Sequence, residues 1–269
     1  MRAVLVALLI ATPALLLPVG QSDNSQIVVL VALLAALLTF IEYSSHFPSI
    51  VEFRDAPPFN RLRFIMLFTN VFLLTVISRG VVEPTLLTNT MTALGTIVGN
   101  AIDFPFSPVR LVVLMLPEQA SADLVAAVRI SAGMSYLVSL TAMAAFVFLL
   151  RGVGWPGRNR VFNVWVNLPL FDPTAGGDVL ERLQRDARLN IALGFLLPFL
   201  IPAVVKMASF LIDPVSLSNP QTLIWTMSAW AFLPASMIMR GMALHRVADM
   251  IEEKRRRTYA AEEDEYQTA

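Results

Sequence analysis

Long apolar runs, separated by short polar connections, dominate the chain. A helix needs about 20 apolar residues to cross the hydrocarbon core of a bilayer, and these runs approach or reach that length. The short alternating segments typical of a membrane β-barrel do not occur. The pattern therefore predicts an all-α integral membrane protein with about six transmembrane helices. The six expected spans fall at residues 3–19, 27–43, 62–77, 130–150, 191–212 and 222–239.

The first run permits two interpretations. It follows Arg2 and is apolar up to a small-residue exit, as a secretory signal peptide is. It fits a retained first helix equally well. The sequence thus leaves open whether residues 1–20 are a cleaved signal or a permanent span, and the other five spans keep their orientation in either case.

Residues 84–117 do not follow the simple alternation of span and loop. Residues 85–102 can form one apolar helix, but Pro105 and Pro108 must end it because proline cannot continue the backbone hydrogen-bond ladder. The apolar piece that follows, residues 109–116, would rise only about 12 Å as a helix, too little to cross a core of about 30 Å. We therefore predict two short helices that lie in the outer leaflet or re-enter it.

Several helices should extend beyond the apolar runs. Ser121 can cap a helix that begins before the fourth run, with Asp123 in its first turn. Residues 178–188 have the spacing of an amphipathic helix that continues into the fifth run. The helix of the sixth run is expected to continue through Glu253.

Basic residues gather in alternate connections, which sets the expected orientation. The loops after the second and fourth runs and the tail are rich in arginine, whereas residues 21–26 and 213–221 contain no basic residue. Because cytoplasmic loops carry the excess of Lys and Arg, we expect both termini in the cytoplasm. The chain has 18 arginines but only two lysines, a bias that suggests a GC-rich bacterial genome, so we expect a bacterial inner-membrane protein. Residues 84–117 would then lie on the periplasmic side.

The chain divides into a transmembrane helical domain, residues 1–253, and a charged cytoplasmic tail, residues 254–269. The tail begins with Lys254, Arg255, Arg256 and Arg257, a run that anionic headgroups would attract. Four acidic residues follow, and we expect this end to be disordered.

Composition narrows the possible chemistry. The chain has no cysteine, which excludes disulfides, thiolate metal sites and cysteine nucleophiles. Its two histidines, His46 and His245, have no zinc-binding spacing, and no serine lies in a hydrolase motif. The formal net charge is zero, so nothing indicates nucleic acid. We predict no catalytic residues, no cofactor and no metal site.

Small residues mark two expected helix contacts. Gly95 and Gly99 are four apart in an apolar segment, and Ser131, Ser135 and Ser139 repeat at the same interval in the fourth run. Small residues at this spacing let a second membrane helix approach closely. These five positions are therefore predicted to serve packing rather than chemistry.

The leading functional hypothesis is a non-catalytic accessory, assembly or scaffolding subunit of a larger membrane complex. Its partners would be other membrane subunits and lipids, and a homo-oligomer is also compatible with the packing surfaces. The alternative is a small transporter or channel whose path runs near Pro198, Pro202 and Lys206, because prolines free backbone carbonyls within a span. For Lys206 itself we expect snorkelling to the outer headgroups. A membrane enzyme ranks third.

Overall fold

The computed structural model describes residues 1–18, 25–156, 163–172, 176–209 and 216–268. Every regular element in these ranges is helical, and five helices, α2, α3, α6 with η1, α8 and α9, are long and apolar enough to cross a membrane. The all-α class is confirmed, and the fold fits a multi-pass membrane protein. The elements are α1 (Arg2–Leu16), α2 (Ser25–Ser44), α3 (Phe59–Gly80), α4 (Leu86–Ile102), α5 (Pro108–Leu114), α6 (Ala122–Phe148), the π-helical turn η1 (Leu149–Val153), α7 (Val164–Asn167), α8 (Val179–Ala208) and α9 (Pro220–Thr268).

The helix at the first of the six expected spans is shorter than the five long helices. Helix α1 has 15 residues, which corresponds to a rise of about 22 Å, less than a core of about 30 Å. Residue 19 of that run and residues 210–212 of the fifth run lie outside the described residues. The number of complete crossings therefore stays a prediction beyond the five long helices.

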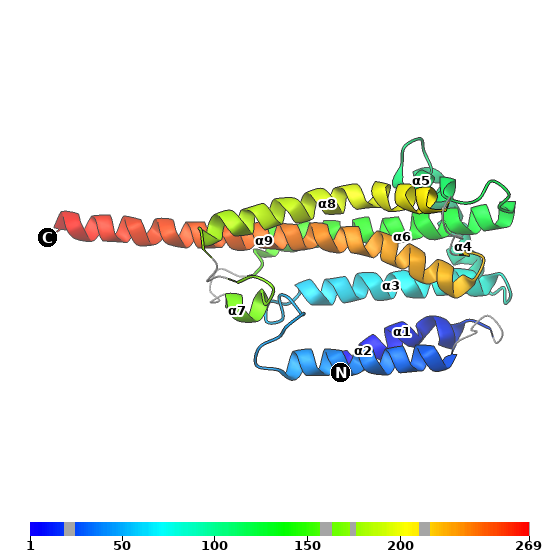
Figure 1. The fold of residues 1–269 in the computed structure, drawn as a ribbon, viewed down its shortest axis with the longest axis horizontal. Helices are drawn as coiled ribbons and strands as arrows, with labels where there is room; N and C mark the ends of the chain where they lie inside the picture. Colours follow the sequence, from blue (N-terminus) through cyan, green and yellow to red (C-terminus); the bar gives the residue numbers. More distant parts are fainter. Residues whose placement is uncertain (19–24, 157–162, 173–175, 210–215, 269) are drawn as a thin grey trace.

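The helices α3, α6, α8 and α9 run alongside one another, and α1 and α2 form a hairpin beside α3 (Figure 1). We call the end where α2 stops at Ser44 and α3 starts at Phe59 the tail end, and the opposite end the α4 end. Helix α9 runs toward the tail end and continues beyond the bundle (Figure 1). Arg2 lies at the tail end too, 4.1 Å from the ring centroid of Tyr43. Both chain termini therefore leave the same end of the bundle.

Helices α8 and α9 form the closest pair because glycine replaces a side chain at two crossing points. A Cβ on Gly194 of α8 would lie 2.7 Å from the carbonyl oxygen of Pro234, and one on Gly241 of α9 would lie 2.7 Å from that of Ala187. Real Cβ atoms do not approach a backbone oxygen so closely. The two backbones therefore touch, as expected where small residues line a membrane helix contact.

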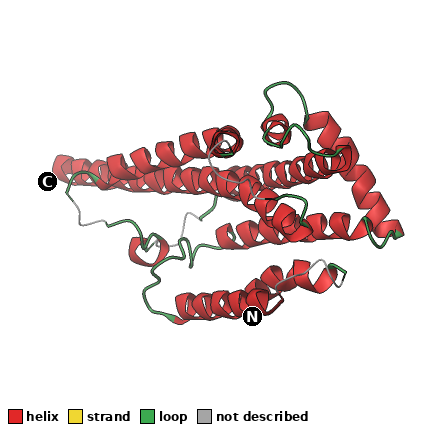
Figure 2. Cartoon of the chain, turned by 45° about the vertical axis from the view of Figure 1, so that its right-hand side comes forward, coloured by secondary structure: helices red, strands yellow, loops and turns green. Residues whose placement is uncertain are grey.

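Helix α4 lies across the end of the bundle rather than along it (Figures 1 and 2). A Cβ on Gly133 of α6 would lie 2.6 Å from the Cα of Gly99, so the two helices cross at glycine. Asp103 ends α4 and pairs with Arg129 of α6 at 2.7 Å and with Arg110 of α5 at 3.3 Å. The two short helices predicted in residues 84–117 are confirmed as α4 and α5, while their side of the membrane stays a prediction.

The expected helix extensions are confirmed. Ser121 accepts a hydrogen bond from the backbone N–H of Leu124, so α6 begins well before its apolar run. Asp178 caps α8 by accepting from the N–H of Leu180, and the amphipathic first turns continue into the apolar part of α8 without a break.

Helix α9 continues to Thr268, through the residues of the predicted tail. Residues 254–268 contain no Gly or Pro, and more than half of them are Ala, Glu, Arg, Lys or Gln, which favour helix. The costly first turn is already formed within the bundle, so each added residue only propagates an existing helix.

Candidate functional site

A buried aromatic cluster at the tail end fixes the loop between α2 and α3. The rings of Phe53 and Phe59 lie 4.5 Å apart, and Trp155 lies 5.6 Å from Phe53 and from Phe146. The indole N–H of Trp155 donates to the carbonyl of Ala56 at 3.2 Å. Segments about a hundred residues apart in sequence are thus held in one rigid unit.

An ion pair joins the same loop to α9. Both carboxylate oxygens of Glu52 accept from Arg240, at 2.6 and 2.8 Å, and the Glu52 side chain is only 7% exposed. Arg63 of α3 lies beside it, over the ring of Phe59 at 5.3 Å. A buried carboxylate requires such a partner because an isolated charge away from water is costly. Glu52 therefore sets where the loop sits against α3 and α9.

The start of the loop is fixed by the last turn of α2. The Glu42 carboxylate accepts from the backbone N–H groups of Ile50 and Val51, at 2.9 and 3.0 Å. In return Arg54 donates to the carbonyls of Glu42 and Ser45 at the helix end. A carbonyl that the helix terminus leaves free is thereby satisfied from the loop.

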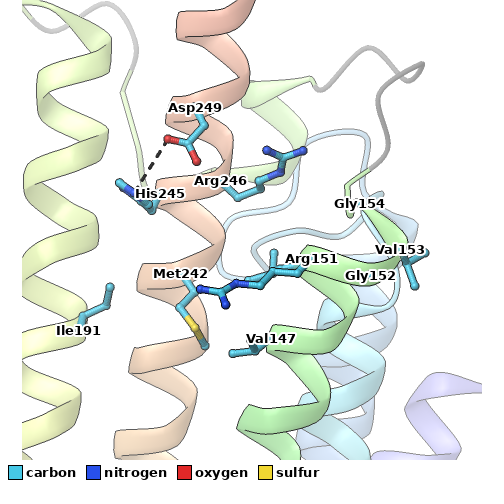
Figure 3. Close-up of a pocket in the computed structure, with 11 residues that line it drawn as sticks. Val147, Arg151, Gly152, Val153, Gly154, Ile191, Met242, His245, Arg246 and Asp249 are labelled. Atoms are coloured by element: carbon cyan, nitrogen blue, oxygen red, sulfur yellow. Dashed lines mark ion pairs between the residues drawn. The ribbon is translucent and has the colours of Figure 1, made fainter.

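A groove of about 820 Å³ opens beside this platform, between the end of α6, the side of α8 and α9 (Figure 3). We call it the tail groove. Apolar and charged side chains both line it. The lining residues are Val147, Leu150, Arg151, Gly152, Val153, Gly154, Ile191, Met242, His245, Arg246 and Asp249.

The charged side chains of the tail groove come from α9 and from η1. His245 and Asp249 lie one turn apart on α9, with 3.9 Å between nitrogen and oxygen. Arg246 donates to the carbonyl of Trp155 at 3.3 Å, and Arg151 reaches toward Met242 (Figure 3). No group of three or more metal-ligating side chains occurs within the described part of the chain. The groove can hold an apolar side chain next to a negative charge.

One further ion pair joins α9 to the rest of the bundle beyond the groove. Arg255 pairs with Asp178 at 2.8 Å, which holds the pKa of that carboxyl below its ordinary value through the hydrogen bond from the guanidinium. Beyond this pair α9 projects away from the other helices (Figure 1). We call Arg256–Thr268 the α9 extension.

The predicted packing residues lie in helix contacts. Ser131, Ser135 and Ser139 are all buried, and the hydroxyl of Ser139 donates to the carbonyl of Ala231 on α9 at 3.1 Å. Gly95 and Gly99 face α6, where a Cβ on Gly95 would lie 2.7 Å from Ile130. The structure thus brings Ser139 against α9 and the two glycines against α6, as two separate contacts.

The predicted transport residues make bonds within the protein. Pro202 has no N–H, which frees the carbonyl of Pro198 one turn earlier, and the Trp230 indole of α9 donates to that carbonyl at 3.1 Å. Lys206 donates to the carbonyl of Leu116 at 3.2 Å, where snorkelling was expected. Pro202 borders a cavity of only about 130 Å³. These three positions therefore tie α8 to α9 and to the end of α5.

Sequence reasoning missed Glu52, Arg240 and Trp155. A usable signal existed for Arg240, because a cation directly after an apolar run requires either water or an acidic partner. Nothing in the sequence pointed to Glu52 as that partner, since 188 positions separate the two.

No protein-family model, curated protein or solved structure matches this chain. The functional conclusion therefore rests on the site geometry alone.

Proposed function

We propose that this protein is a non-catalytic accessory or assembly subunit of a larger complex in the bacterial inner membrane. The observation that carries the proposal is the α9 extension, a helix that leaves the bundle after the Asp178–Arg255 pair. The tail groove lies next to its base and shares Asp249 with the surface that leads onto the extension. Together they form one continuous surface suited to a partner protein.

Beyond the bundle the α9 extension projects away from the other helices (Figure 1). The sequence of this segment carries four acidic residues, 262–265, after its basic run. A cationic partner surface would complement them. We therefore expect the partner to present cationic groups to this segment.

Geometry favours a protein over the lipid surface as the ligand of the tail. Lys254 follows the expected end of the last span by 15 residues, a rise of about 22 Å along the helix. The headgroup layer is only about 5–8 Å thick on each side. Arg255 and Arg257 are moreover paired with Asp178 and Glu253. The predicted binding of headgroups by residues 254–257 therefore receives less support than partner binding.

The orientation belongs to the same proposal. The arginine-rich connections lie at the tail end, which we place in the cytoplasm together with both termini. The transporter alternative draws on Pro198, Pro202 and Lys206, but the freed carbonyl and the amine are already bonded within the protein. It is therefore the weaker hypothesis.

The test is affinity purification of the tagged full-length chain in mild detergent, with the co-purifying subunits quantified by mass spectrometry. Arg151→Glu reverses a charge in the tail groove and should lower partner recovery about tenfold or more, as charge reversal at an interface does. Arg185→Glu is the matched control, because Arg185 is exposed on α8 outside the groove.

Two results would contradict the proposal. One is a wild-type protein that purifies without stoichiometric partners while binding or moving a solute alone, which would favour the transporter. The other is an equal loss of partner with Arg151→Glu and Arg185→Glu, which would show that the groove has no specific part in binding.

A further inference from the structure

A second pocket, of about 400 Å³, lies at the tail end between α1, α2 and α3. It combines two kinds of side chain that rarely meet in one cavity. Arg2, Arg54 and Arg61 line it, and so do the apolar side chains of Leu5 and Phe64. This combination requires an explanation, because arginine is normally solvated or paired.

The pocket carries an excess of positive charge. No carboxylate lines it. Arg54 holds the last carbonyls of α2 and has an ion pair with the exposed Asp55 at 3.4 Å. Arg2 lies over the Tyr43 ring, a contact that leaves its N–H donors available. Arg61 makes no ion pair with any residue that the structure describes.

An apolar track leads away from these charges. The rings of Phe64, Phe68 and Phe72 stack along α3, with centroids 5.9 and 6.2 Å apart. Phe72 is exposed, so the row is not fully covered by other helices. The row extends from the pocket toward the α4 end, in the direction that an acyl chain would take if the bundle spans a membrane.

The pocket also lies at the ends of α2 and α3, beside a helix that is largely exposed. Tyr43 is near the last residue of α2, and Arg61 is in the first turn of α3. Ends of membrane helices lie at the depth of the headgroups. Only 11% of the apolar stretch of α2 is buried, because α2 packs mainly on α1. Lipid therefore has direct access to this part of the molecule.

We propose that the pocket binds an anionic glycerophospholipid, with its phosphate between Arg61 and Arg2 and an acyl chain along Phe64, Phe68 and Phe72. Guanidinium groups bind phosphate through paired N–H donors, which suits them to this headgroup better than ammonium groups. The site does not involve α9 and is independent of the proposed partner docking. The lipid would fill the space between the α1–α2 hairpin and α3.

The experiment is native mass spectrometry of the delipidated full-length protein, titrated with phosphatidylglycerol, phosphatidylcholine of the same chain length, and inorganic phosphate. Phosphatidylglycerol should bind at least about fivefold more tightly than phosphatidylcholine, and inorganic phosphate should not compete. Arg61→Gln should weaken phosphatidylglycerol binding about fivefold, the effect of one basic group near an anionic headgroup. The matched control, Arg256→Gln, removes a cation from the α9 extension and should leave binding unchanged.

Each of three outcomes would overturn the proposal. Equal binding of the two lipids would show that the headgroup charge is not recognised. Full competition by inorganic phosphate would indicate a site for a free anion. Unchanged phosphatidylglycerol binding by an Arg2→Gln, Arg61→Gln double variant would place the lipid elsewhere. The double variant is compared with wild type in a lipid-free thermal unfolding scan, so that a loss of binding is read only from folded protein.

Discussion

Replacing Trp230 by phenylalanine tests how α8 tolerates two prolines within a candidate span. Pro202 cannot donate to the carbonyl of Pro198, and the Trp230 indole makes the missing hydrogen bond at 3.1 Å. Phenylalanine can preserve the stacking on Tyr136, now 6.0 Å between centroids, but removes the donor. The buried carbonyl of Pro198 would then have no partner.

The cost can be estimated term by term. A buried acceptor without a partner costs about 1–3 kcal/mol in general, whereas hydrogen bonds between membrane helices average about 0.6 and reach about 1.7 kcal/mol. We therefore expect Trp230→Phe to lose about 1–1.5 kcal/mol from the hydrogen bond, plus about 1 kcal/mol for the smaller side chain.

A double-mutant cycle separates the two terms. In a Pro202→Ala background, residue 202 supplies an N–H to the Pro198 carbonyl, so Trp230→Phe should cost only its packing term. Unfolding in detergent by denaturant, monitored by circular dichroism, measures the four free energies. A coupling of about 1 kcal/mol is expected. A coupling below about 0.5 kcal/mol, the usual scatter of additive mutations, would refute the assignment of this hydrogen bond.

Three further predictions concern packing and charge. Ser135→Leu should lower the free energy of unfolding by about 1–3 kcal/mol through overpacking. Ser135→Ala should be neutral, because the buried Ser135 hydroxyl has no partner in the described structure. Equal stabilities of the two variants in a thermal scan would contradict this. Glu52→Ala should lower the free energy of unfolding by about 3 kcal/mol, the low end for a broken buried pair, because Arg240 keeps some exposure. A smaller loss of stability in the double variant Glu52→Ala, Arg240→Met would support the pairing. Because the pKa of Asp178 is lowered, its pair with Arg255 is fully formed above the ordinary aspartate pKa and is lost only as the pH falls through the lowered pKa. A spin label on the α9 extension should therefore gain mobility only in that acidic range, and Arg255→Gln should abolish this pH dependence.

Local signals accounted for most of the helix assignments. Pro105 and Pro108 forbid helix whatever surrounds them, and Ser121 and Asp178 satisfy N–H groups that any helix start leaves free. These effects act within a few residues, so they can be read from one sequence. For residues 254–268 the expectation rested on charge, whereas the helix propensity of Ala, Glu and Arg in this segment favours the continuation of α9 that the structure has.

Contacts between distant segments could not be predicted. Trp230 and Pro198 lie 32 positions apart, and their bond depends on the register between α8 and α9, which glycine contacts fix. Lys206 illustrates the consequence. Its sequence context is that of a snorkelling side chain, but the end of α5 brings the Leu116 carbonyl within 3.2 Å. The tail groove likewise forms only where three helices pack together, so no single segment of the sequence predicts it.

The two ends of the bundle differ in how their charges are used, and this places both proposed sites at the tail end. At the α4 end, Asp103 is satisfied by Arg129 and Arg110, which pins α4 and α5 onto α6. At the tail end, Glu52 neutralises only Arg240, while Arg61 and Arg151 make no ion pair within the described residues. Cations that the fold leaves unpaired on an otherwise rigid platform are available to ligands. We therefore expect acidic protein side chains at the tail groove and lipid phosphate at the α1–α3 pocket.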